Sequence, residues 1–137
     1  MARLVSCLTT TILLVGSGCN PTKVTKFTDD ATAQFVRRVE QGKDDEIYAS
    51  AAPEFLKSTT REDLVRTSSL LRQKMGACSN FERRKITFET TLHGPVVTTI
   101  VHATCDNGPL AESFTWLIEN DRALLLNFGA DSPALHR

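Results

Sequence analysis

The sequence predicts an α+β fold in which about three N-terminal helices pack on one face of a four-stranded antiparallel meander sheet. Before residue 83, apolar residues recur at helical spacing. From Arg83 onward the pattern alternates with a period of two, and β-branched and aromatic residues become frequent. The turns between the expected strands are short, which is typical of antiparallel neighbours. The 137 residues have the length of one domain.

The first helix is expected to begin near Thr28, whose hydroxyl can cap it, and to stop at Gly42. Two acidic residues follow Thr28, where the helix dipole favours negative charge. The apolar or small positions of this helix are Ala31, Phe35, Val36 and Val39. A second, shorter helix is expected over residues 44–52, closed by Pro53.

The third helix carries the clearest signals. Thr59 and Glu62 have the spacing of a capping box, and Gly76 ends the helical pattern. The apolar positions at helical spacing are Leu64, Val65, Leu70, Leu71 and Met75. Charged residues on the other sides of these helices are interpreted as solvated faces: Arg37, Arg38, Glu40, Arg66, Arg72 and Lys74.

Four strands are expected near residues 84–92, 96–105, 110–119 and 123–128. Alternation gives the sheet one apolar face, which the helices should cover, and one polar, threonine-rich face. In the last strand Leu124, Leu125 and Leu126 are consecutive, so alternation does not decide which face is inward. Either a one-residue bulge interrupts this strand, or exposed leucines mark a surface for a partner.

Cys78 and Cys105 are expected to form a disulfide if the chain is exported to an oxidising compartment. The alternatives are a metal site, which lacks further ligands at short spacing, or two unpaired thiols. In the expected register Cys105 lies opposite Glu82, close to the loop that carries Cys78. A bond between the two cysteines would therefore attach the third helix to the sheet.

The first residues have the parts of an export signal: Arg3, an apolar run over residues 4–15, and small residues before Cys19. They resemble a bacterial lipoprotein signal, although Gly16 stands where such signals carry an aliphatic residue. The resemblance implies a signal peptide over 1–18, a lipidated Cys19 with a short tether to residue 28, one α+β domain over 29–130, and a tail over 131–137. The alternative is an ordinary secretory signal in which Cys19 carries no lipid. A lipid anchor implies the periplasmic face of the envelope, and Asn20 after the cysteine slightly favours the outer membrane.

Three helices followed by a four-stranded meander resemble the nuclear transport factor 2-like, or cystatin-like, superfamily. The residues that carry the resemblance are Phe35, Val36, Gly42, Ile47, Tyr48, Ala51, Phe55, Met75 and Gly76. More specifically, the chain resembles small exported domains of unknown function in that superfamily. The resemblance implies a cone-like fold with a cavity between helices and sheet that is small or filled.

The candidate pocket consists of Tyr48, Glu112, Phe114 and Trp116. Glu112 is the one carboxylate that the expected register places on the apolar face; it is either a buried group with a raised pKa or a solvated group at the rim. The sequence contains no recognised catalytic set, metal site or cofactor motif. The acidic run at residues 44–46 fits the first turn of a helix better than a calcium loop.

The charges balance, with 16 Lys and Arg against 16 Asp and Glu, so nucleic acid is not an expected partner. The leading hypothesis is a lipid-anchored periplasmic module that binds a protein partner or a small ligand without catalysis. A first alternative is an immunity or inhibitor lipoprotein against a toxin or a cell-wall hydrolase. A second is a small enzyme that uses Glu112 and Tyr48.

Overall fold

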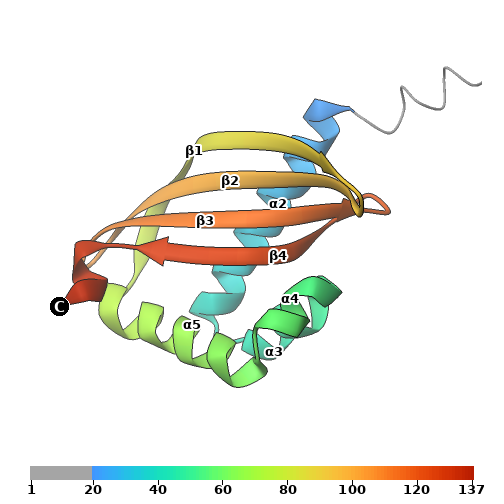
Figure 1. The fold of residues 1–137 in the computed structure, drawn as a ribbon. Coiled ribbons are helices and arrows are strands. Elements are labelled where there is room, and N and C mark those ends of the chain that lie inside the picture. The colour runs from blue at the N-terminus through green and yellow to red at the C-terminus, as the bar shows by residue number, and fades with distance from the viewer. Residues whose placement is uncertain (1–19) are drawn as a thin grey trace, which may run out of the picture.

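The computed structural model describes residues 20–137 and has the predicted α+β architecture. Within these residues, four α-helices precede a sheet whose strands follow the order β1-β2-β3-β4, all antiparallel. Figure 1 shows α2 crossing behind the strands, with α3, α4 and α5 along one side of the sheet. The helices are α2 (Pro21–Glu40), α3 (Asp44–Ser50), α4 (Pro53–Ser58) and α5 (Arg61–Met75); the strands are β1 (Cys78–Thr91), β2 (Gly94–Cys105), β3 (Gly108–Glu119) and β4 (Arg122–Asp131).

Helix α2 begins at Pro21, so the predicted tether over residues 20–28 was wrong. The Asn20 side chain caps the helix by accepting hydrogen bonds from the amides of Thr22 and Lys23. Pro21 then occupies the first helical position, where its missing N–H costs nothing. Val24 and Phe27 extend the apolar spacing upstream of Thr28, which is buried inside the helix and does not cap it.

Three further predictions about the helices were wrong. Pro53 does not only end α3; it also opens the short helix α4, whose Phe55 is buried. The capping residue of α5 is Thr60, which accepts from the Asp63 amide, one position beyond the predicted pair Thr59 and Glu62. Leu70 does not extend the apolar stripe of α5, since it is exposed on the outer side of the helix.

The sheet has the predicted apolar and polar faces, but its registers differ by small shifts. Thr90, and not the expected Leu92, pairs with Pro95. Ala103, and not the expected Cys105, pairs with Leu110. Both shifts are of two residues, so each strand keeps its predicted face. The pairing of β3 with β4 contains an irregularity at Thr115 and Trp116 that leaves Leu126 as the additional residue. The bulge interpretation of the three leucines is therefore confirmed, and Leu125 is the one that faces the core.

Cys78 and Cys105 form the predicted disulfide. They pair directly across β1 and β2, because two irregularities in β1 shift the register away from the predicted partner Glu82. The bond lies beside the end of α5, where the backbone amides of Asp106 and Asn107 donate to the carbonyls of Ala77 and Met75. As expected, helix and sheet are joined at this point.

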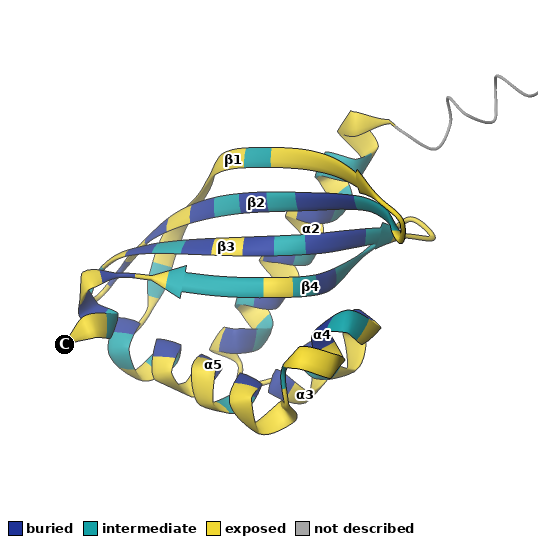
Figure 2. Cartoon of the chain, viewed as in Figure 1, coloured by how far each residue is buried: buried dark blue, intermediate teal, exposed yellow. Residues whose placement is uncertain are grey.

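The core lies between α2, the other helices and the inner face of β2 to β4, and β1 takes little part in it. Figure 2 shows buried residues along β2 and β3 and a mostly half-buried β4, whereas β1 is exposed over nearly its whole length. The C-terminal residues also belong to the domain, since β4 reaches Asp131 and a 3-10 helix (Pro133–His136) buries Ala134 against the core. The predicted tail at 131–137 is thus packed on the domain. Within residues 20–137 no helix is both long and apolar enough to span a bilayer.

Candidate functional site

The four predicted pocket residues do not share one cavity. Phe114 and Trp116 stack with their ring centroids 5.8 Å apart in the main core cluster, and the half-buried Tyr48 packs against the same cluster. Glu112 lies two residues before Phe114 on the same face of β3, towards a second cluster formed around Leu71, Met75 and Leu110. Of the two groups that the enzyme alternative requires, Glu112 lines the smaller of the two clefts described below and Tyr48 lines neither.

A large cleft runs between α2, α3 and β4 and has a volume of about 720 Å³. Its floor is apolar, with Phe35, Ile47, Trp116 and Leu125 all buried in the core. Half-buried apolar side chains continue this surface towards the opening: Phe27, Ala31, Ala51, Ala123 and Leu124. This continuous apolar lining suits the apolar part of a ligand.

The rim of the large cleft is mainly basic. Arg37 and Arg38 come from α2 and Arg122 from the start of β4, with Asp30 as the one acidic residue of the lining. Arg38 forms an ion pair with Glu46 at 3.3 Å, whereas Arg37 and Arg122 make no ion pair within residues 20–137. Trp116 adds an indole N–H without a hydrogen-bond acceptor in this part of the chain. The site therefore offers cationic donors above an apolar floor.

A second, smaller cleft of about 40 Å³ lies between α2, α5 and the beginning of β1. Glu112 lines it from β3 and is only 6 % exposed, so the interpretation of Glu112 as a solvated rim residue was wrong. Burial, and secondarily the negative charge of Glu40, raises the pKa of Glu112 to about 7. Its Oε2 atom has no hydrogen-bond partner within the described residues.

The acidic run at the start of α3 has structural partners. Asp44 is buried, accepts a hydrogen bond from the Ser68 hydroxyl and lies 3.5 Å from Nη1 of Arg72. Asp45 accepts a hydrogen bond of 2.6 Å from Nε of Arg61, and this hydrogen bond lowers the pKa of the Asp45 carboxyl group. Across residues 20–137, the His, Cys, Asp and Glu side chains form no group suited to hold a metal ion. The structural role predicted for the run agrees with these contacts.

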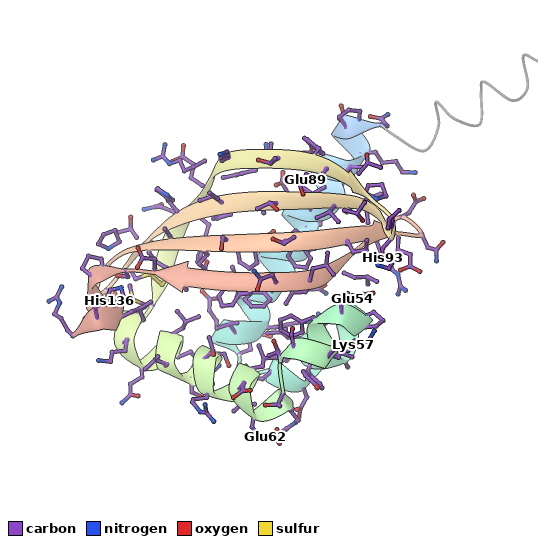
Figure 3. The ribbon with its side chains drawn as sticks, viewed as in Figure 1. Glu54, Lys57, Glu62, Glu89, His93 and His136 are labelled. Carbon is purple, nitrogen blue, oxygen red and sulfur yellow. A yellow bond between two sulfur atoms is a disulfide. The ribbon has the colours of Figure 1, made fainter. Side chains whose placement is uncertain are left out.

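The histidines are well separated. Figure 3 shows His93 at the turn between β1 and β2, whereas His136 lies at the opposite end of the sheet near the C-terminus. His102 is exposed on the outer face of β2. They therefore do not form a shared site.

The large cleft could not be predicted from sequence patterns because its cations come from distant parts of the chain. Arg37 and Arg38 were interpreted as a solvated helix face, and Arg122 belonged to no motif. Because α2 starts at Pro21, helical spacing puts Phe27, Asp30 and Gln34 on the same side as Arg37. This spacing is the one local signal of the cleft in the sequence. The proximity of Arg122 depends on the tertiary fold.

The predicted lipid site, Cys19, and the whole predicted signal lie outside the described residues. A search for protein-family models and a search among curated proteins found no match to this chain.

Proposed function

We propose that this protein is an exported module that is held at the periplasmic face of a bacterial envelope by a lipid on Cys19, and that it binds its partner or ligand in the large cleft. The observation that carries the binding proposal is the cleft itself, with about 720 Å³ of space above an apolar floor. We propose no catalytic role, since Glu112 lines the small cleft and Tyr48 lines neither of the two clefts.

The lining defines the chemistry of the ligand. Two arginines without ion-pair partners in residues 20–137, Arg37 and Arg122, favour a carboxylate or a phosphate, which the planar guanidinium binds with two parallel hydrogen bonds. The floor around Trp116 and Leu125 favours an apolar group next to that anion. A protein segment with an acidic and a large apolar side chain has both features, as has a small anionic amphiphile.

The early start of α2 supports a position close to the membrane. Pro21 is the first helical residue, two positions after Cys19, and Phe27 of the cleft is the seventh. At about 1.5 Å per residue, the helix places Phe27 only about 9 Å from its own beginning. A lipid on Cys19 would therefore hold the cleft near the bilayer surface, and the partner would be an envelope component.

A comparison of variants in envelope pull-downs tests the binding site. The full chain with Arg37→Glu and Arg122→Glu is compared with the wild type and with Lys57→Glu, which removes an exposed cation on α4 outside the cleft (Figure 3). We expect a stoichiometric partner or a bound small molecule with the wild type and with the Lys57 control, and its loss with the cleft variant. Recovery of the same partner by the cleft variant would contradict the proposal.

The anchor is tested separately. Cys19→Ala is expected to abolish metabolic labelling of the protein with a fatty acid and to leave the precursor uncleaved. Unchanged labelling would place the lipid on another residue, and an unlabelled but cleaved wild type would indicate an ordinary secretory signal.

A further inference from the structure

The small cleft beside Glu112 is a site of its own, separate from the large cleft used in the proposed function. It lies where α2, α5, β3 and the beginning of β1 meet. Its volume of about 40 Å³ exceeds the roughly 10–15 Å³ that one water molecule requires. A small polar group can therefore enter it.

The polar end of this cleft is an unsatisfied carboxyl group. Oε2 of Glu112 is buried and has no hydrogen-bond donor within residues 20–137. Glu40 on α2 lines the same cleft and adds a second carboxylate, and Cys78 is bound in the disulfide and does not titrate. The group that completes this site must donate hydrogen bonds, and the two carboxylates favour a positive charge.

The one cation in the lining does not fill this role. Nη1 of Arg72 donates to the backbone carbonyl of Val39 at 2.7 Å and lies 3.5 Å from Asp44. Its guanidinium is thus engaged between α2 and α3, and Arg72 does not contribute to the pKa of Glu112. The carboxyl group is left for an external donor.

The walls of the cleft are apolar. Val39, Leu71, Met75 and Leu110 are buried around it, and Val36 is half-buried. Phe81 of β1 lines the cleft with 38 % of its surface exposed, and the face of an aromatic ring attracts cations. These walls suit a short alkyl chain behind a charged head.

We propose that the small cleft binds a primary alkylammonium group, with its N–H donors on Glu112 and its alkyl chain along the apolar walls. An ammonium group carries three donors and no acceptor, which complements a carboxylate without partners. Its bond to an ionised carboxylate is charge-assisted and stronger than a bond between neutral groups. The alkyl chain gains from contact with the apolar walls, as lysine side chains do on protein surfaces.

The test is an NMR titration of the full chain, solubilised in a non-ionic detergent, with n-butylammonium at pH 8. At this pH Glu112 is mostly ionised and the amine is protonated. We expect saturable shifts at the Glu112 carboxyl and at the amides of Gly76 and Phe81, and none with n-butanol. A titration of the Glu112 carboxyl with saturating amine is expected to give a pKa below its value without amine, because a bound cation favours the ionised form. Equal effects of amine and alcohol, or an unchanged pKa, would overturn the proposal.

Variants assign the effect to the site. Glu112→Gln is expected to weaken amine binding about tenfold or more, which is the size expected for loss of a charge-assisted bond. Glu119→Gln, an exposed position on the same strand, is the matched control and should bind as the wild type does. Undiminished binding by a folded Glu112→Gln protein would contradict the assignment, and the carboxyl titration of the wild type decides the question if that variant does not fold.

A capped lysine with a free side chain, Nα-acetyl-lysine N-methylamide, distinguishes two sources of the ammonium group. Affinity comparable with that of n-butylammonium would indicate a lysine side chain of a polypeptide, whereas clear preference for the free amine would indicate a small amine. Failure of both probes to saturate would mean that the cleft holds water only.

Discussion

Burial raises the pKa of Glu112 from 4.5 to about 7, and this shift couples the stability of the fold to pH. Between pH 4.5 and about pH 7, Glu112 is protonated in the folded protein, whereas the unfolded chain has already released this proton. The free energy of unfolding should therefore fall as the pH rises from about 4.5 to 7, and the contribution of Glu112 is lost above this range. A shift of this size corresponds to about 3 kcal/mol.

We predict that Glu112→Gln removes this dependence. The variant should unfold at a higher denaturant concentration than the wild type at pH 8, and the difference should shrink towards pH 4.5. Chemical denaturation across this pH range measures both curves, with Glu119→Gln as the exposed control on the same strand. Parallel curves for Glu112→Gln and the wild type would show that the Glu112 carboxyl is solvated in the folded protein.

The bulge in β4 gives three adjacent leucines different environments. Leu125 is 3 % exposed and packs in the main core cluster, whereas Leu124 and Leu126 are half-buried. We predict that Leu125→Ala lowers the free energy of unfolding by about 2–5 kcal/mol, the usual range for a buried leucine. Leu126→Ala should cost clearly less, because its side chain is outside the core. Equal losses in denaturation measurements would contradict the position of the bulge.

At the scale of the elements, the sequence patterns predict the sheet better than the helices. Alternation from Ile86 onward assigns the strand faces correctly, since a register shift of two residues leaves each side chain on its face. The start of α2 was predicted too late because Thr22 and Thr25 are weak helix formers. The helix nevertheless begins at Pro21, where the Asn20 side chain caps it. Helix α4 was missed because Pro53 ends one helix and begins the next.

A buried hydrogen bond joins α3 to α5, in addition to the ion pairs of Asp44 with Arg72 and of Asp45 with Arg61. The Ser68 hydroxyl donates to Asp44, which is 7 % exposed and would otherwise lose a donor in the interior. Ser68→Ala is predicted to lower the free energy of unfolding by about 1–3 kcal/mol, the cost of an unsatisfied buried group. Thr67→Ala, an exposed neighbour on α5, should change it little. Thermal or chemical unfolding of the two variants distinguishes these outcomes.

At the scale of the whole molecule, the disulfide closes a loop of 27 residues that contains nearly all of β1 and β2. On the chain-entropy estimate this bond contributes about 3.5 kcal/mol. We predict that reduction lowers the free energy of unfolding by about this amount, and that the double variant Cys78→Ala with Cys105→Ala is insensitive to reductant. Intact-mass analysis after alkylation should find both thiols of the oxidised protein blocked; two free thiols would contradict the bond.

Only part of the candidate sites could be predicted from the sequence. Glu112, Phe114 and Trp116 were recognised because they alternate on one strand, which is a local pattern. The depth of Glu112 could not be predicted, since it depends on the cover provided by α2 and α5. The rim of the large cleft likewise joins α2 to the start of β4, more than 80 residues apart in the chain.

Photo-crosslinking in living cells tests most directly whether the large cleft binds an envelope partner or ligand. A photoreactive amino acid is placed at Ala33, an exposed residue lining the large cleft, and in a second protein at Thr104, an exposed residue of β2 outside it. We expect a discrete adduct from position 33, identified by mass, and none from position 104. An adduct from position 104 alone, or identical products from both positions, would contradict this expectation.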